Sequence, residues 1–204
     1  MRKNYLDTVE ALVQALEAKD SYTSGHSSRV AQWSVKLAEE LDLPEARLEF
    51  IKYASVLHDV GKIGVSEAIL TKKGQLDHSE WEIIRNHPII GQQIVQSINS
   101  LFDVGSVVRY HHERIDGAGY PDGLKGTDIP LESRIIAVAD AYDAMTSTRS
   151  YREPFTTSAA LAELRRVAGT QLDSEIVEAF CRIIQNEYPQ TEPASIKNEQ
   201  IVNC

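Results

Sequence analysis

Apolar residues recur every three to four positions along most of the chain, a spacing that predicts amphipathic helices rather than strands. No segment of the sequence keeps the strict alternation of a half-buried strand, and no long repeat is present. The sequence therefore predicts an all-α bundle. Its expected helices cover residues 6–16, 30–41, 48–58, 77–84, 89–98, 104–111, 135–142, 159–167 and 176–184.

Several helix ends are marked by local signals. Asp77, followed three residues later by Glu80, has the pattern of a capping box that opens a helix. Pro88 directly follows His87, so His87 should lie at a helix boundary or bend. Residues 113–130 hold several glycines and prolines and should form a long loop, and loops of that length in compact domains are usually functional or disordered.

The length of 204 residues favours one domain, expected over residues 1–185, with a polar and flexible C-terminal tail over 186–204. A hydrophobic fraction of 42% is enough to bury a core. No apolar run approaches 18 residues, so we expect no membrane span. Cys181 and Cys204 are too few for a disulfide framework, and a reducing cytoplasm is the simplest location.

The charge balance is acidic and limits the partners. The chain has 21 Lys plus Arg against 30 Asp plus Glu, which gives a formal net charge of −9. This balance argues against DNA or RNA as the general partner, because proteins that bind nucleic-acid backbones show basic stripes. A small phosphorylated ligand stays compatible, since metal ions and a few local cations can supply positive potential.

Five of the six histidines and two aspartates form short clusters that indicate a metal centre. Neutral imidazoles and carboxylates are ligands of borderline divalent ions such as iron, manganese or zinc. The set is too large for one ordinary site, and two ions about 3.5–4 Å apart can hold both oxygens of a phosphoryl displacement. A metal-dependent phosphohydrolase is therefore predicted. The candidate ligands are His26, His58, Asp59, His87, His111, His112 and Asp140.

Two of these carboxylates have specific arguments. Asp59 is the best candidate for a bridge between two ions, because a carboxylate offers two oxygens and an imidazole one nitrogen. Asp140 lies in an apolar run, where a buried carboxylate needs a partner such as a metal ion. A lone histidine is usually structural or solvated, and His78, among polar neighbours, is expected to be exposed.

The sequence contains three short motifs, His58-Asp59-Val60-Gly61-Lys62-Ile63-Gly64, His111-His112-Glu113 and Gly119-Tyr120-Pro121. Together with segments within residues 17–27, 86–88, 139–147 and 168–171, they resemble the pattern of HD-GYP domains, a subgroup of the HD metal-dependent phosphohydrolases. The resemblance covers about residues 5–184. It implies a helical bundle of the HD phosphohydrolase type, with the glycine-rich loop beside the metal centre. It also implies hydrolysis of cyclic dinucleotides, above all cyclic di-GMP, to pGpG or GMP by water that two metals activate.

The resemblance also implies how the ligands are divided. One metal would take His26, His58, Asp59 and Asp140, and the other Asp59, His87, His111 and His112. Some members hold a third metal through a glutamate one turn before the first histidine, but that position is Tyr22 here, so two metals are favoured. Iron or manganese is the expected metal, and zinc, nickel and magnesium are also compatible with this set of ligands.

Residues around the metals receive roles by the same resemblance. Lys62 and Asp59 would be the catalytic residues, and Lys62 would face the scissile phosphate. The alternative for Lys62 is a solvated lysine at a helix C-terminus. Arg149 and Arg152 would hold substrate phosphates through their guanidinium groups, unless they are simply surface arginines. Gly117 and Tyr120 belong to the loop, which is either a wall of the substrate site and a contact for diguanylate cyclase (GGDEF-type) partners or a mere chain reversal.

Several alternatives stay open at this point. Glu113 and Asp143 could each orient a ligating histidine or only cap a helix. An active phosphodiesterase is favoured over a non-catalytic receptor or cyclase-docking module, because all seven ligand positions are present. Cyclic GMP-AMP is the alternative substrate. The chain is either a stand-alone enzyme or a piece of a longer regulator, and residues 6–16 could be a linker or a dimer helix.

Overall fold

The structure, a computed structural model, describes Val13, Glu17 and residues 25–72, 74–148 and 153–188. Within these residues it is helical, with one isolated β-bridge between Ala168 and Leu172, and this confirms the all-α prediction. The α-helices are α2 (His26–Glu40), α3 (Glu45–Leu57), α4 (Glu67–Leu70), α5 (His78–Arg85), α6 (His87–Gln96), α7 (Val104–Tyr110), α8 (Leu131–Thr146), α9 (Thr157–Val167) and α10 (Ser174–Glu187). Short 3₁₀ helices are η1 (Val60–Gly64), η2 (Asn99–Leu101) and η3 (Gly126–Asp128).

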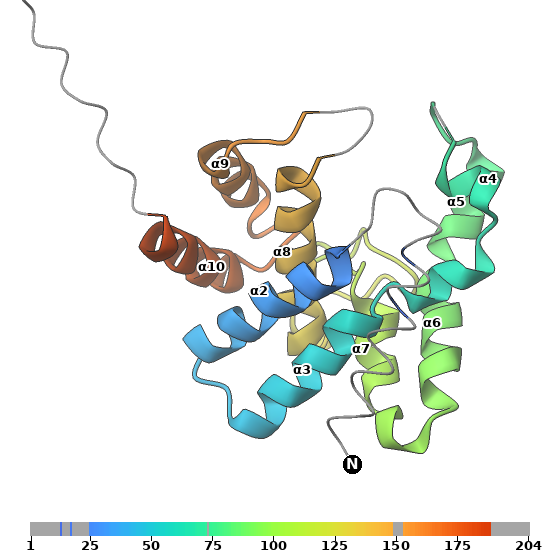
Figure 1. Cartoon of the computed structure of the whole chain (residues 1–204), viewed down its shortest axis with the longest axis horizontal. Helices are drawn as coiled ribbons and strands as arrows, with labels where there is room; N and C mark the ends of the chain where they lie inside the picture. The colour runs from blue at the N-terminus through green and yellow to red at the C-terminus, as the bar shows by residue number, and fades with distance from the viewer. Residues whose placement is uncertain (1–12, 14–16, 18–24, 73, 149–152, 189–204) are drawn as a thin grey trace, which may run out of the picture.

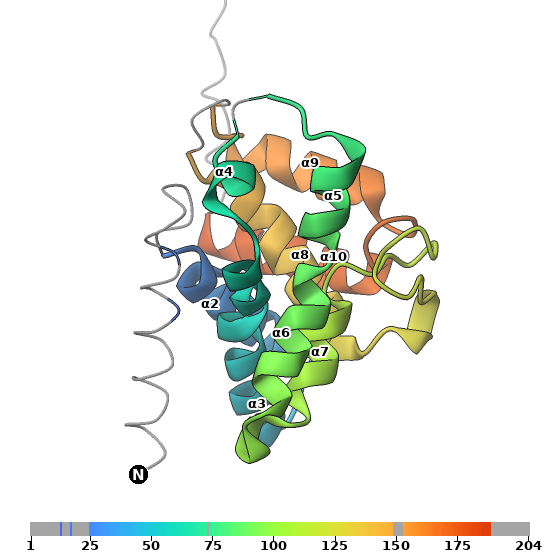
Figure 2. The ribbon, with the colours of Figure 1, turned by 90° about the vertical axis from the view of Figure 1, so that its right-hand side faces the viewer.

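The helices pack in neighbouring pairs (Figure 1). α2 and α3 form a hairpin across residues 41–44, and α8 packs against α2 and contacts α9 and α10. α6 lies beside α7, as the view in Figure 2 shows, and η1 packs against α6. Among the described residues, no helix combines the length and the hydropathy that crossing a lipid bilayer requires.

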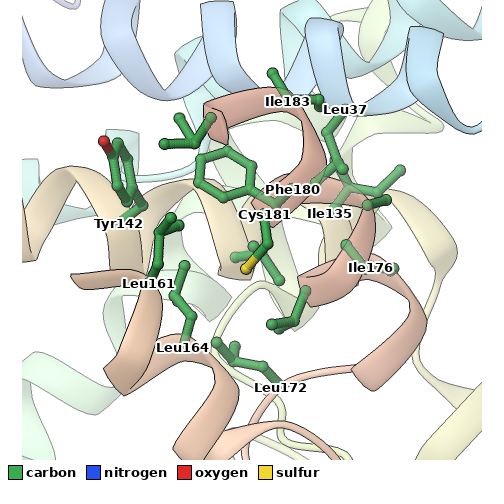
Figure 3. Packing of buried hydrophobic residues seen from close by; sticks show 14 of the residues in the cluster. Leu37, Ile135, Tyr142, Leu161, Leu164, Leu172, Ile176, Phe180, Cys181 and Ile183 are labelled. Atoms are coloured by element: carbon green, nitrogen blue, oxygen red, sulfur yellow. The ribbon is translucent and has the colours of Figure 1, made fainter. Parts of the chain in front are cut away.

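The largest apolar cluster lies between α2, α8, α9 and α10. Figure 3 shows its side chains gathered around the fully buried Phe180 of α10. The ring of Phe180 lies 4.9 Å from that of Tyr142 and 5.6 Å from that of Trp33, in the edge-on geometry that aromatic pairs favour. This cluster fixes α8, the helix that carries Asp140, against α2, the helix that begins at His26.

A second apolar cluster joins the elements that carry the remaining candidate ligands. It contains Ala54 and Leu57 of α3, Val107 and Val108 of α7 and Ala139 of α8, all buried. Because these residues are close neighbours of the candidate ligands in sequence, the packing that forms the core also sets the positions of the ligands.

Most of the predicted boundaries agree with the structure. The capping box of Asp77 and Glu80 is present, and the chain breaks between α5 and α6 at Asn86, next to His87. α6 is shifted by two residues from the prediction, since it begins at His87 and ends at Gln96 instead of covering 89–98. α8 is longer than predicted, because it covers Leu131–Thr146 and not only 135–142.

The two ends of the chain are only partly described. α10 continues to Glu187, two residues into the segment that the sequence predicts to be a polar tail. Residues 189–204 of that segment, and the predicted helix over residues 6–16 except Val13, lie outside the described residues.

Candidate metal centre

Each candidate ligand lies at or near the end of a helix, apart from Asp140 within α8. His26 and His87 are the first residues of α2 and α6, while His58 and His111 directly follow α3 and α7. The structure brings the donor atoms into two groups, and within each group they lie within 4.8 Å of one another. The groups are His26, His58 and Asp140, and Asp59, His87, His111 and His112. Except for Asp59, which the resemblance assigns to both metals, each residue falls in the group that the resemblance implies.

The Asp59 carboxylate lies between the two groups and presents one oxygen to each. Its Oδ2 is 3.4 Å from His58 Nε2 and 3.9 Å from His26 Nε2. Its Oδ1 is 3.2 Å from His87 Nε2 and 3.9 Å from His111 Nε2. His26 Nε2 is also 3.4 Å from Asp140 Oδ1. A bridging position for Asp59 therefore fits the geometry.

The donor set and its spacing suit two divalent ions. Two donors that each lie about 2.1 Å from one ion are roughly 3.0–3.4 Å apart at octahedral or tetrahedral angles, close to the separations seen here. His58 Nε2 and Asp59 Oδ1 are buried and have no hydrogen-bond partner. Buried polar atoms are normally paired, and these two atoms with their neighbours fit the coordination of a cation.

Three of the histidines are oriented by the helix that precedes them. The Nδ1 atoms of His58, His87 and His111 lie 2.7, 2.7 and 2.6 Å from the carbonyl oxygens of Ser55, Ile84 and Val108, each three residues earlier. Carbonyls in the last turn of a helix lack a helical partner, so they are available to accept this hydrogen bond. The proton is then on Nδ1, and Nε2 keeps its lone pair for the centre.

His26 is oriented by a carboxylate instead. Its Nδ1 donates to Asp143 Oδ2 at 2.8 Å, and the Arg29 guanidinium binds the same carboxylate at 2.6 and 3.1 Å. The Glu17 carboxylate accepts from the amides of Gly25 and Ser27 at 2.8 and 2.7 Å, which fixes the first turn of α2. Of the two open roles for Asp143, the structure supports the orientation of a histidine.

Electrostatics favours the ligand forms of His58, His111, His112 and Asp59. Burial lowers the pKa of His58, His111 and His112, for His112 to about 3, so these imidazoles are neutral near pH 7. Burial alone would raise the pKa of Asp59, but the Lys62 ammonium and His58 hold it well below its usual range. Burial also opposes ionisation of Asp143, yet its bonds to His26 and Arg29 lower the pKa to about 2.

Lys62 lies at the edge of the centre on η1. Its Nζ donates to Asp59 Oδ2 at 2.6 Å, and its side chain is 28% exposed. Helix α3 ends at Leu57 and does not reach Lys62. The 3₁₀ turn η1 nevertheless places the side chains of Asp59 and Lys62, which are three residues apart, on the same side. A Cβ on Gly61 would lie 1.9 Å from the carbonyl oxygen of His87, so only glycine lets η1 approach α6 this closely.

The glycine-rich loop lies against the centre through Tyr120. The Tyr120 ring stacks on His112 with centroids 4.9 Å apart, and its amide donates to the His112 carbonyl at 3.2 Å. The Glu113 carboxylate accepts from the amides of Asp122 and Gly123 at 2.7 and 3.0 Å, so it braces the loop rather than a histidine. The loop is therefore more than a chain reversal between two helices.

The far side of the loop is fixed by the segment before α10. The amides of Ile115 and Asp116 donate to the carbonyls of Gln171 and Thr170 at 3.3 and 2.9 Å. Gly117, at φ +81°, lies in this part of the loop, and the atoms nearest to a Cβ there would belong to Gly123 and Lys125. The structure thus brings Tyr120 to the metal centre, while Gly117 has its closest contacts within the loop.

Other expectations fall elsewhere. Arg149, Arg152 and Tyr22 lie outside the described residues. His78 is exposed, as expected. Arg29 was not predicted as a site residue, because the helix expected from the sequence begins only at residue 30. In the structure Arg29 lies three residues after His26 on α2, which places the two side chains on one face.

Comparisons with known proteins agree with this centre. The family model described as "HD domain" matches residues 10–176. The cyclic di-GMP phosphodiesterase response regulator RpfG of Xanthomonas campestris pv. campestris is 42% identical over 178 residues, which are 86% of this chain and 47% of the relative. The 3′3′-cGAMP-specific phosphodiesterase 3 of Vibrio cholerae is 36% identical over 192 residues, 93% of this chain and 42% of the relative. The chain thus spans somewhat less than half the length of these relatives.

A solved structure supports the fold. Bd1817, an HDG"Y"P protein from Bdellovibrio bacteriovorus, superposes with a TM-score of 0.68 at 22% identity, covering 89% of this chain and 63% of that chain. At this identity the likeness speaks for the fold alone. Together with the family match over most of the sequence, these findings show that the chain belongs to the HD domain family, as the HD-GYP motifs predicted.

Proposed function

We propose that this chain is a metal-dependent phosphodiesterase that hydrolyses cyclic di-GMP. The observation that carries the proposal is the convergence of the seven donor residues into two groups that share the Asp59 carboxylate. In the reaction, a water oxygen forms a bond to phosphorus and the bond from phosphorus to a 3′ oxygen breaks, giving linear pGpG. A second cleavage gives GMP.

The protein's own residues would prepare this reaction. When bound, two divalent ions would lower the pKa of a water and neutralise phosphate charge. The histidines, held through Nδ1, would keep the ions in a fixed geometry, and fixed groups need no rearrangement in the transition state. Lys62 places a positive charge at the edge of the centre, where it would stabilise a phosphate oxygen. Arg149 and Arg152 are proposed to hold the substrate's phosphates.

The second candidate substrate is 3′3′-cGAMP. It is favoured by the similarity to the Vibrio cholerae enzyme, which covers 93% of this chain. The same centre would act on either compound, because the reacting phosphodiester groups are alike. A diguanylate cyclase partner, a dimeric state, a cytoplasmic location and the preference for iron or manganese remain predictions.

Product analysis after anaerobic loading with Fe²⁺ or Mn²⁺ tests the proposal. The protein should convert cyclic di-GMP to pGpG or GMP, and 3′3′-cGAMP should be run beside it. Asp59→Ala should lose bound metal and turnover together, while Asp103→Ala, at an exposed aspartate away from the centre, should keep both. Nucleotide binding without product would favour the receptor alternative, and turnover by metal-free Asp59→Ala protein would contradict the assignment.

A further inference from the structure

A groove with a volume of about 490 Å³ begins where the metal centre ends. It is lined mainly by α5, the start of α6 and the loop, including Glu82, Arg85, Asn86, Ile90, Tyr120 and Pro121, and is here called the α5 groove. Tyr120 belongs to both places, since one side of its ring stacks on His112. Asn86 directly precedes His87, and Figure 2 shows α5 standing above the start of α6.

The size of the α5 groove suits part of a nucleotide. Sites for small ligands usually measure about 300–1,000 Å³ and combine apolar walls with a few polar groups. Ile83 and Ile90 supply apolar surface, and Arg85, Glu82 and Asn86 supply the polar groups. A cyclic dinucleotide with one phosphate at the metal centre would extend a base into a neighbouring groove.

Arg85 lies beside Tyr120 and Glu82 at the groove. Its guanidinium carbon lies 5.3 Å from the centre of the Tyr120 ring, a cation–π arrangement. Glu82, one turn earlier on α5, is 4.0 Å away, and both side chains are more than half exposed. An exposed pair at this distance is weak, so a ligand can replace it at little cost.

The two charged groups together match guanine better than adenine. Guanine O6 and N7 accept two hydrogen bonds from one guanidinium, and guanine N1–H and N2–H₂ can donate to a carboxylate. Adenine carries an amino donor in place of O6, so the guanidinium would face a donor. We propose that the α5 groove binds a guanine base of the substrate and that Arg85 is a specificity-determining residue; this inference rests on the proposed function.

Equilibrium binding and turnover of three cyclic dinucleotides test the inference. Wild-type protein should bind cyclic di-GMP and 3′3′-cGAMP at least tenfold more tightly than cyclic di-AMP. Arg85→Gln should raise both Kd and KM for cyclic di-GMP about tenfold, change kcat less than twofold, and narrow the discrimination against cyclic di-AMP. Arg85→Lys keeps the positive charge but loses the planar guanidinium, so it should reduce the discrimination against cyclic di-AMP by a similar factor.

A matched control is Arg166→Gln. Arg166 is exposed on α9 and pairs with Glu163 three residues earlier, as Arg85 does with Glu82, but it lies away from the groove. This variant should behave as wild type. Bis(p-nitrophenyl) phosphate, a phosphodiester without a base, should be cleaved equally by all of these proteins.

The outcomes separate the two proposals. Three results would overturn the inference and leave the proposed phosphodiesterase activity in place. The first is an unchanged Kd for cyclic di-GMP and unchanged discrimination against cyclic di-AMP in Arg85→Gln, and the second is wild-type values of both in Arg85→Lys. The third is a loss of bis(p-nitrophenyl) phosphate cleavage that parallels the loss of cyclic di-GMP binding. If metal-loaded wild type cleaves no phosphodiester, the proposed function fails, and the Kd values alone decide the inference. Wild type that binds no cyclic dinucleotide would overturn the inference as well.

Discussion

At the residue scale, the metal centre depends on groups that hold the histidines in one orientation. Asp143 holds His26 through Nδ1 and is itself held by Arg29. The other three oriented histidines use backbone carbonyls, which no side-chain substitution removes. Asp143 is therefore the position where orientation can be tested by mutation.

We expect Asp143→Asn to weaken metal binding by the His26, His58 and Asp140 group about 10–100-fold, because His26 loses its carboxylate partner. The group of His87, His111 and His112 should keep its affinity. At a free metal concentration that is just sufficient to fill both sites of the wild type, the content measured by mass spectrometry should fall from two ions per chain to about one in the variant. Equal loss from both groups would argue against a local orienting role.

The same residue should make stability depend on pH in acid. The pKa of Asp143 is about 2 in the folded protein and about 3.8 when unfolded, so its stabilising effect is complete above about pH 5 and is lost as pH falls toward 2. The shift corresponds to roughly 2 kcal/mol of unfolding free energy. Urea unfolding with chelator between pH 2 and 5 should show a smaller pH dependence for Asp143→Asn than for Asp103→Asn.

At the element scale, local signals predicted the helices well because each signal acts within a few residues. The capping box of Asp77 and the break before Pro88 are examples. The 3₁₀ turn η1 was not predicted, because it exists through the close approach of Gly61 to α6, a contact remote in sequence. The anchoring of Asp116 to Thr170 is equally non-local. The candidate ligands were predictable from residue type and motif, whereas the groups that orient them required the packed structure.

Two glycines of η1 allow a direct test of this packing. Gly61→Ala should lower the free energy of unfolding by about 3 kcal/mol, because its Cβ would meet backbone atoms of His87 and Gly91. Gly64→Ala should cost less than about 1 kcal/mol, since it meets only the end of the flexible Ile90 side chain. Urea denaturation of both variants checks this, and equal losses would contradict the packing described here.

At the scale of the whole molecule, the metal centre connects segments from His26 to Asp140 that are far apart in the chain. The two apolar clusters bring these segments together, and bound ions would add to their stability. An ion that binds only the folded chain stabilises it by about 4 kcal/mol at a thousand times its Kd.

Chelation should therefore lower the melting temperature. For a chain of this size, about 4 kcal/mol corresponds to roughly 8–16 °C. Differential scanning fluorimetry of metal-loaded protein with and without EDTA measures the shift. Asp59→Ala should melt at nearly the same temperature in both conditions, and a full EDTA shift in that variant would place the stabilising ions elsewhere.

The two oxygens of Asp59 differ in a way that bears on the order of occupancy. Oδ1 has no hydrogen-bond partner, whereas Oδ2 is held by the Lys62 ammonium. An incoming cation meets no competitor beside His87 and His111, but beside His26 and His58 it must displace a resident positive charge. The two metal sites should accordingly fill one after the other and with unequal affinity, so that at low metal concentration the chain binds one ion. Calorimetric titration should resolve two steps, and Lys62→Met should bring them closer together.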